Sequence, residues 1–329
     1  MPYGRGMFAV YAAAFDPTDP LAGLAFGDRP DPALPRDDWT TVSVRAAALN
    51  HHDLWSLKGV GLSADELPRI LGCDAAGVDA DGNDVLIHSV ISEPTWLGDE
   101  TLDPKRSLLS ERYDGTFAER VAVPRRNLIP KPPALSWEEA ACLPTAYLTA
   151  YRMLFGQARL KPGDSVLVQG AGGGVATALI MLARAGGLRV FATSRDEAKR
   201  KRALSIGAHA AVETGARVPH RVDAVMDTVG EATWSHSIKS LRPGGTLVLS
   251  GATSGEKPPT AELRRIFYLS MRIQGTTMGT RTELGQVASF LDVTGVRPLI
   301  DRTLPLDRAR DGFAAMERGE LFGKVVLTV

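Results

Sequence analysis

Three consecutive glycines, Gly172, Gly173 and Gly174, have the residue type and the place in the chain that binding a pyrophosphate requires. They follow a short apolar run, residues 165–169, and precede a helical pattern that begins at Val175. Glycine lets backbone amides come close to an anion, and the N-terminus of a helix adds unpaired N–H groups and a partial positive charge. The glycines and Val175 are therefore predicted to bind the diphosphate of a dinucleotide.

The loop departs from the usual dinucleotide fingerprint, G-x-G-x-x-G/A. Ala171, Gly173 and Ala176 stand where the pattern expects its small residues, so that the first is alanine and the last is the alanine that the pattern permits. A glycine cluster by itself is also typical of a flexible turn. The apolar run before it and the helix after it favour a cofactor loop.

Hydroxyl and cationic side chains follow the next strand, which is predicted over residues 188–193. An NAD enzyme places an aspartate or glutamate here, about twenty residues after the loop, against the ribose 2′-hydroxyl. This chain instead has Ser194 and Arg195, with Lys199 one helical turn further on. These side chains suit a 2′-phosphate, because charge-assisted hydrogen bonds contribute about 1.5–3 kcal/mol each. They predict NADPH rather than NADH.

The alternative is that this segment forms only a solvent-exposed helix face. Asp196 and Arg200 have the i,i+4 spacing of a surface ion pair, and Glu197 and Lys201 repeat that spacing. We assign Arg200, Lys201 and Arg202 to such a face, and we keep the two cations nearer the strand end for the phosphate.

The elements that position these residues alternate between helix and strand. Short connections between alternating elements predict a parallel sheet covered by helices on both faces, a doubly wound α/β fold. We expect helices at 175–185, 197–205 and 233–240, strands at 165–169, 188–193, 210–212, 223–227, 246–249 and 272–275, and a turn at 241–245. Ser250, Gly251 and Ala252 follow one strand at the carboxyl edge, where open α/β sheets bind ligands, so they are predicted to contact the cofactor.

The residues before this sheet have a different character. Residues 1–130 are rich in Pro, Gly and Asp turns with short alternating apolar runs, which predicts a mainly β domain. A proline-rich stretch at 130–133 forms a stiff connection, and residues 137–155 are predicted to be helical. After residue 276 we expect a helix, a strand, a second helix and a final strand at 324–329 that rejoins the first domain.

Length and composition limit the class of protein. At 329 residues, with 44% hydrophobic and 23% charged residues, the chain has the size of about two globular domains. A formal net charge of zero gives no overall field to attract nucleic acid or an anionic membrane, and no apolar stretch reaches the roughly twenty residues that span a bilayer. The first residues lack the apolar segment of a secretory signal, and the two cysteines do not require an oxidising compartment, so we expect a cytoplasmic protein.

Ordered blocks along nearly the whole chain resemble the medium-chain dehydrogenase/reductase superfamily, and within it the zinc-free quinone oxidoreductase branch. The blocks are LNHHDLWSLKG at 49–59, GCDAAG at 72–77, DGTFAERVAVP at 114–124, ACLPTAYLTAYRML at 141–154, LKPGDSVLVQGAGGGVATALIMLA at 160–183, LRPGGTLVLSG at 241–251, QGTTMG at 274–279 and FGKVVLTV at 322–329. The resemblance implies a GroES-like catalytic domain, residues 1–130 and 277–329, a Rossmann domain, residues 131–276, and a cofactor cleft at their junction. It also implies a homodimer.

The resemblance gives meaning to residues that the chain lacks. Zinc alcohol dehydrogenases of this superfamily carry a catalytic cysteine where Asn50 stands, Gly-His-Glu where this chain has Gly-Cys-Asp at 72–74, and a lobe with four cysteines. A catalytic zinc needs about three protein ligands and an open position. Cys73, Cys142 and a histidine at 51–52 could be forced into such a set, but we expect both cysteines to be small buried residues and the histidines to bond locally or face solvent.

Without a Lewis acid to stabilise an alkoxide, oxidation of an unactivated alcohol is difficult, whereas reduction of an electrophilic acceptor stays easy. Hydride from the nicotinamide would go to a quinone or to the β-carbon of an α,β-unsaturated carbonyl. By resemblance, Asn50 and Asp53 lie beside the nicotinamide, and Trp55 on the same segment offers an aromatic wall for a flat acceptor. Thr149 resembles the threonine that contacts the nicotinamide side of the cofactor, and Lys324 is expected to close over the cofactor.

Each of these assignments has a structural alternative: a turn residue at Asn50 or Asp53, core packing for Trp55 and an ordinary helix hydroxyl for Thr149. The sequence offers no obvious equivalent of the tyrosine acid that many relatives place near here. Three functions are therefore left to separate: an NADPH-dependent reductase, an NADPH-binding sensor or partner protein with little turnover, and a zinc-dependent alcohol dehydrogenase.

Overall fold

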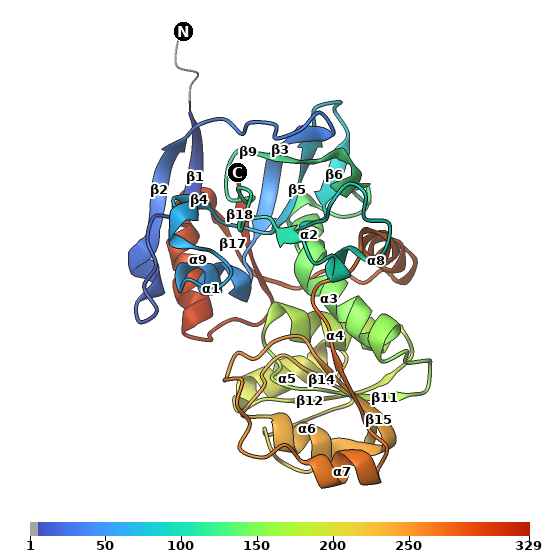
Figure 1. Ribbon diagram of the computed structural model, residues 1–329. Coiled ribbons are helices and arrows are strands. Elements are labelled where there is room, and N and C mark those ends of the chain that lie inside the picture. The colour runs from blue at the N-terminus through green and yellow to red at the C-terminus, as the bar shows by residue number, and fades with distance from the viewer. Residues whose placement is uncertain (1–5) are drawn as a thin grey trace. The chain divides into compact units, whose positions relative to one another are not determined.

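The predicted doubly wound sheet is present in the computed structural model, which describes residues 6–329. Its strands are β11 (Ser165–Val168), β12 (Arg189–Thr193), β13 (Ala210–Val212), β14 (Val222–Asp227), β15 (Leu241–Leu249) and β16 (Arg272–Gly275). Within the described residues they form a six-stranded sheet in the order β13-β12-β11-β14-β15-β16, and all neighbours pair in parallel (Figure 1). The chain order turns back between β11 and β14, which is the point where such sheets bind ligands.

Helices connect these strands. They are α3 (Leu148–Tyr151), which lies between π-helical turns at Leu143–Tyr147 and Arg152–Gln157, α4 (Gly174–Ala185), α5 (Glu197–Ser205), α6 (Trp234–Ser240) and α7 (Leu263–Tyr268). Because parallel strands are joined by right-handed crossovers, α4 and α5 cover one face of the sheet and α6 covers the other. The sheet buries Leu167, Phe191, Val225 and Leu247 in an apolar cluster.

Two features of this sheet differ from the sequence prediction. The predicted turn at 241–245 belongs to β15, where the pairing with β14 passes from Leu241 directly to Thr246, so that the residues between them bulge out of the ladder. The pattern also did not predict α7. That helix has six residues, so its apolar positions, although at helical spacing, extend over too short a segment to show a repeat.

The mainly β part of the chain forms smaller, mixed sheets. Its strands are β1 (Met7–Ala12), β2 (Leu24–Arg29), β3 (Trp39–Ala48), β4 (Arg69–Ile70), β5 (Asp74–Asp79), β6 (Asp84–Ile87), β7 (Val90–Ile91), β8 (Ser107–Leu108), β9 (Arg120–Pro124), β10 (Leu128–Pro130), β17 (Ile300–Pro305) and β18 (Lys324–Thr328). The main sheet has the order β10-β6-β5-β3-β18-β17, with β9 also paired to β3. The antiparallel pairing of β18 with β3 confirms that the final strand rejoins the N-terminal domain.

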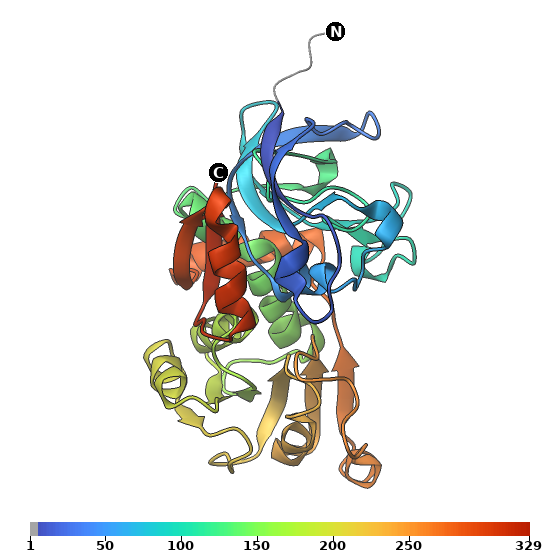
Figure 2. The ribbon, with the colours of Figure 1, turned by 90° about the vertical axis from the view of Figure 1, so that its left-hand side faces the viewer.

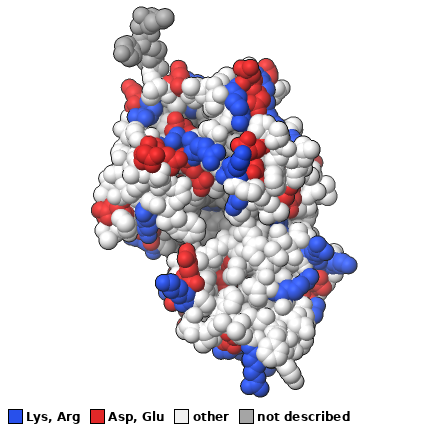
Figure 3. Space-filling view, viewed as in Figure 1, with Lys and Arg blue, Asp and Glu red and all other residues white. Residues whose placement is uncertain are grey.

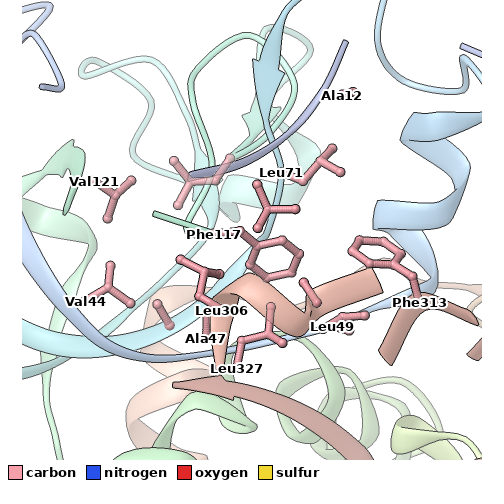
Figure 4. Packing of buried hydrophobic residues seen from close by; sticks show 14 of the residues in the cluster. Ala12, Val44, Ala47, Leu49, Leu71, Phe117, Val121, Leu306, Phe313 and Leu327 are labelled. Carbon is pink, nitrogen blue, oxygen red and sulfur yellow. The ribbon is translucent and has the colours of Figure 1, made fainter. Parts of the chain in front are cut away.

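This part also contains helices. They are α1 (His51–Leu57), α2 (Trp137–Ala141), α8 (Arg281–Thr294) and α9 (Ala309–Glu317). Figure 2 shows α9 in red beside strands of the same colour. Phe313 of α9 meets Phe117 edge-on, with ring centroids 6.2 Å apart, and Leu49 and Leu327 belong to the same buried cluster (Figure 4).

The described chain divides into two units. The first unit comprises the described residues up to Thr145, together with Thr280–Val293 and Ile300–Val329. The second unit comprises Ala146–Gly279 and Thr294–Leu299. The division lies beyond the boundary at residue 130 that the sequence suggested, because α2 packs on β3, β5 and β18 of the first unit.

Candidate active site

The glycine loop connects the end of β11 to the start of α4. Gly170, with φ 69°, and Gly172, with φ 145°, adopt backbone conformations that residues with side chains rarely adopt, so this turn depends on glycine. Gly173 is the N-cap residue of α4 and is exposed, and a Cβ there would meet no atom within 4 Å. The first-turn amides of Gly174 and Val175 have no acceptor inside their own helix. The loop thus offers open space and helix-end donors at the place where the sequence predicted a diphosphate.

The residues predicted to select a 2′-phosphate lie at the carboxyl end of β12. Ser194 is buried, Arg195 is exposed, and Lys199 is half-buried in the first turn of α5. Asp196 is the N-cap of α5, and its carboxylate accepts the backbone N–H of Lys199 at 3.2 Å, which fixes where the helix begins. The structure therefore gathers one hydroxyl and two cations at this strand end.

Arg200 has a contact that its spacing did not predict. Its guanidinium Nη1 donates to the backbone oxygens of Ser194, at 2.8 Å, and Arg195, at 3.2 Å. The other predicted ion pair does form, with Lys201 Nζ 2.8 Å from Glu197 Oε1. Arg200 thus holds the turn after β12. Sequence spacing missed this role, because it depends on the side chain folding back toward the strand.

The remaining predicted cofactor contacts lie on β15 and on α3. Ser250, Gly251 and Ala252 are partly exposed directly after β15, and the Ser250 N–H donates to the oxygen of Asp227 at the end of β14, at 3.1 Å. Since β11, β12 and β15 run parallel, the glycine loop and these residues emerge at the same edge of the sheet. Thr149 is buried in α3.

Lys324 of β18 is a buried cation, with 3% of its surface exposed. Its Nζ donates to the oxygen of Leu49 at 2.7 Å, to Asn50 Oδ1 at 2.7 Å and to Asp74 Oδ2 at 3.0 Å. An ammonium has three hydrogens, so the protein satisfies all of them. Asn50 Nδ2 donates to the oxygen of Ala48 at 3.3 Å, which leaves the carboxamide in one orientation. The structure places Lys324 inside the first unit as the residue that orients Asn50, and its contact with a cofactor stays a prediction.

Asp53 lies in the first turn of α1 and is fully buried. Its Oδ2 accepts the backbone N–H of Asn50 at 2.8 Å, and its Oδ1 accepts that of Gly72 at 3.1 Å. The pKa of Asp53 is raised to about 7, chiefly by burial and also by Asp74, against the opposing effects of the two backbone donors and Lys324. Asp53 thus braces the start of α1 against Gly72, and its place beside the nicotinamide stays a prediction.

Trp55 is half-buried in α1, and the two histidines before it differ. His51 is exposed, whereas His52 Nε2 lies 3.8 Å from Glu111 Oε1. The pKa of His52 is lowered, because the effect of burial outweighs the opposing effect of Glu111. Glu111 Oε2 accepts the backbone N–H of Leu108 at 2.9 Å, which fixes the carboxylate. The sequence did not reveal this pair, because Glu111 lies in a loop far from α1 along the chain.

The donors that a zinc site would use are engaged with protein partners. Cys73 Sγ donates to the oxygen of Leu109 and Cys142 Sγ to that of Glu138, each at 3.2 Å. Both thiols are free and buried, and burial raises the pKa of Cys73 well above its usual value and that of Cys142 to about 12. A zinc ligand must be a thiolate, so a metal here would have to displace the proton of each buried thiol. Within residues 6–329, no cluster of three or more His, Cys, Asp or Glu side chains is arranged to hold a metal ion.

Charged side chains of both signs are interspersed on the face that Figure 3 shows, in keeping with the zero net charge. Exposed charges of opposite sign also pair in the first unit, as Arg125 Nη1 does with Asp81 Oδ2 at 3.3 Å. In the part of the chain that the structure describes, no helix is both long enough and apolar enough to cross a bilayer.

Comparison with known proteins finds two matching families along the chain. Residues 36–133 match the family "Alcohol dehydrogenase GroES-like domain", and residues 174–292 match the family "Zinc-binding dehydrogenase". The 2-methylene-furan-3-one reductase of Solanum lycopersicum is 32% identical over 89% of this chain and 72% of its own length. The acryloyl-coenzyme A reductase of Sulfurisphaera tokodaii is 28% identical over 94% of this chain and 97% of its own length.

A solved structure has the same fold over almost the whole chain. It is described as an NAD-dependent alcohol dehydrogenase, is 35% identical and superposes with a TM-score of 0.90 over 98% of this chain and 100% of its own. The first unit is accordingly a GroES-like domain and the second a Rossmann domain. With the family matches, the relatives and the parallel-sheet topology in agreement, this chain belongs to the medium-chain dehydrogenase/reductase superfamily of oxidoreductases.

Proposed function

We propose that this protein is an NADPH-dependent reductase of α,β-unsaturated carbonyl compounds. The observation that supports it best is one edge of the Rossmann sheet, where the glycine loop at α4 is followed by Ser194, Arg195 and Lys199 at the end of β12. A diphosphate would bind the helix-end amides, and the 2′-phosphate would bind the hydroxyl and the two cations.

The second unit would hold the cofactor with four groups of residues. Backbone amides of residues 172–175 would bind the diphosphate, and residues 194–199 the adenosine phosphate. Residues 250–252 would contact the nucleotide at the end of β15, and Thr149 the nicotinamide side. When bound, NADPH supplies the hydride. One similar structure is described as NAD-dependent. The preference for NADPH over NADH is therefore the part of the proposal that most needs a test.

Two observations favour an activated alkene as the acceptor. The names of two relatives, an acryloyl-coenzyme A reductase and a 2-methylene-furan-3-one reductase, describe such substrates. In the first unit, Asn50 and Asp74 are bound to the Lys324 ammonium, and they are therefore not free to ligate a metal that would activate an alcohol. A quinone, which accepts hydride by the same chemistry, is the second acceptor class to assay.

Within the first unit we propose distinct roles for three residues of one segment. Asn50, whose carboxamide is oriented by Lys324, would contact the nicotinamide or the acceptor. Trp55, half-buried in α1, would form an aromatic wall beside the acceptor. Asp53 would position both by fixing the start of α1 through its bonds to the Asn50 and Gly72 amides.

The test combines binding with turnover. Titration followed by nicotinamide fluorescence should show that NADPH binds at least about tenfold more tightly than NADH, the effect expected from one charge-assisted hydrogen bond or more. Purified protein should then oxidise NADPH with enones or enoyl thioesters. Equal affinities would remove the phosphate assignment. Binding without turnover across enones, enoyl thioesters and quinones would favour the sensor alternative, and stoichiometric bound zinc would favour an alcohol dehydrogenase.

We further propose a homodimer that forms along β16. This strand ends the Rossmann sheet, as Figure 2 shows in orange, and all four of its residues are exposed. The neighbouring α7 exposes Phe267 at 71% and Tyr268 at 78%. An unpaired edge beside an apolar helix is a surface that proteins usually cover, and a second copy can do so by antiparallel pairing about a twofold axis. The two free cysteines agree with the proposed cytoplasmic location.

A further inference from the structure

A chain of buried side chains runs beneath the glycine loop of the second unit. The Gly170 N–H donates to Thr193 Oγ1 at 3.1 Å, and the Thr193 hydroxyl donates to Gln169 Oε1 at 2.7 Å. Gln169 Nε2 donates to Ser237 Oγ at 3.0 Å, and the Ser237 hydroxyl donates to Asp227 Oδ2 at 2.7 Å. All four side chains have 1% or less of their surface exposed. We call Asp227, Ser237, Gln169 and Thr193 the Asp227 chain.

These residues come from neighbouring parts of the sheet's carboxyl edge. Asp227 ends β14, Gln169 directly follows β11, and Thr193 ends β12, while Ser237 lies on α6. Since β12, β11 and β14 are adjacent strands, the Asp227 chain crosses the sheet at the edge from which the glycine loop leaves.

The donor and the acceptor of each hydrogen bond in the Asp227 chain follow from the Asp227 carboxylate. Asp227 Oδ1 accepts the backbone N–H groups of Val229, at 2.8 Å, and Gly230, at 3.0 Å. An ionised carboxylate can only accept, so the Ser237 proton points to it and the Ser237 lone pairs face Gln169. The Gln169 amide nitrogen must then face Ser237, and its oxygen must face the hydroxyl of the next residue in the chain.

At the end away from Asp227, the Asp227 chain therefore offers an acceptor to the glycine loop. With its own proton committed to Gln169, Thr193 presents a lone pair to the Gly170 N–H. The backbone oxygen of Thr193 also accepts the Ala171 N–H, at 2.7 Å. The first two amides of the loop are therefore tied to β12, and the open first turn of α4 begins after the N-cap residue Gly173.

His236 gives the Gln169 amide a second constraint. The His236 Nε2 lies 2.9 Å from the carbonyl oxygen of Ala216, which can only accept, so Nε2 carries the proton. In the neutral ring Nδ1 then has a lone pair, and it accepts the other hydrogen of Gln169 Nε2 at 2.9 Å. Both hydrogens of the Gln169 amide are thus used, and the alternative orientation would set the Gln169 oxygen against the lone pairs of Ser237 and His236.

We propose that the Asp227 chain positions the glycine loop for the cofactor diphosphate, with Thr193 as the residue through which it acts. This inference rests on the proposed function, because it supposes that a dinucleotide binds at α4. Buried hydrogen-bonded networks fix geometry, since an unpaired member is costly. Thr193 is accordingly a positioning residue for a group that NADPH and NADH share, in contrast to Arg195 and Lys199, which would act on one nucleotide only.

The test is the isosteric variant Thr193→Val, which removes the hydroxyl and leaves the Gly170 amide without its acceptor. We expect the dissociation constants of NADPH and NADH to rise together, by about five- to fifty-fold, with their ratio unchanged and kcat at saturating cofactor nearly unchanged. Thr193→Ser, which keeps the hydroxyl, should bind both nucleotides within about twofold of the wild-type protein. If Thr193→Val does not fold, Ser237→Ala takes its place, because it removes the hydroxyl that links Asp227 to Gln169.

Thr233→Val is the matched control. The Thr233 hydroxyl donates to the same Asp227 Oδ2, at 2.7 Å, and is equally buried, but it does not lie between Asp227 and the loop. It should lower thermal stability and leave both affinities unchanged. The inference is overturned if Thr193→Val binds both nucleotides normally, if it weakens NADPH alone, or if Thr233→Val weakens them equally. A wild-type protein that binds neither nucleotide would instead overturn the proposed function.

Discussion

Replacing Lys324 by methionine should destabilise the first unit strongly, because the change removes the only cation that touches the buried Asp74 in the structure described here. Asp74 is fully buried, and its Oδ1 already has no hydrogen-bond partner within residues 6–329. Lys324→Met also leaves Asn50 Oδ1 and the oxygen of Leu49 without their donor. Breaking a buried ion pair by removing one partner costs about 3–5 kcal/mol, so we expect the free energy of unfolding to fall by roughly 4 kcal/mol.

A double-mutant cycle separates the effect of the unpaired Asp74 charge from the effect of the changed side-chain shapes. In Asp74→Asn with Lys324→Met the unpaired carboxylate is gone, and the loss should shrink to about 2 kcal/mol, less than the sum of the single variants. Urea unfolding followed by tryptophan fluorescence reports mainly on the first unit, because Trp234 alone among the five tryptophans lies in the second. Lys105→Met, at an exposed lysine of the same unit, is the control and should change the free energy of unfolding by about 0.5 kcal/mol or less. A Lys324→Met protein as stable as the control, or single losses that simply add, would refute the reasoning.

Three other outcomes follow from the structure. Arg195→Ala with Lys199→Ala should weaken NADPH about tenfold or more and leave NADH within about twofold, whereas Lys201→Ala, at a paired surface lysine, should change neither; a matched loss of both nucleotides would count against the phosphate assignment. The folded pKa of Asp53, about 7, lies above its ordinary 3.8, so its favourable contribution is complete below pH 3.8 and is lost as pH rises to about 7, by roughly 4 kcal/mol in total. Urea unfolding between pH 4 and 8 should therefore show a steeper decline in stability for the wild-type protein than for Asp53→Asn, and parallel curves would contradict the raised pKa. Phe267→Glu should shift the sedimentation coefficient from that of a dimer to that of a monomer, and an unchanged value would place the interface elsewhere.

Much of the Rossmann unit was predictable because its signals are local. Apolar runs bounded by glycine and proline mark buried parallel strands, and α5 and β13 have the bounds that were predicted for them. The helix α7 was missed because its six residues are too few for the helical spacing of Leu263, Ile266 and Phe267 to repeat. The turn expected at 241–245 is a bulge within β15, since only pairing with β14 shows that the strand continues beyond it.

By itself, the sequence determined the family, the order of the elements and the residue types at the candidate cofactor loop, because each depends on neighbours along the chain. Tertiary structure decided the partners of Lys324, the pairing of His52 with Glu111 and the role of Arg200. Each of these depends on which distant segments meet, and on which hydrogen-bonding groups burial then forces to pair. The Asp227 chain is the clearest case, because its members are separate in sequence and acquire a common function only where adjacent strands end at one edge of the sheet.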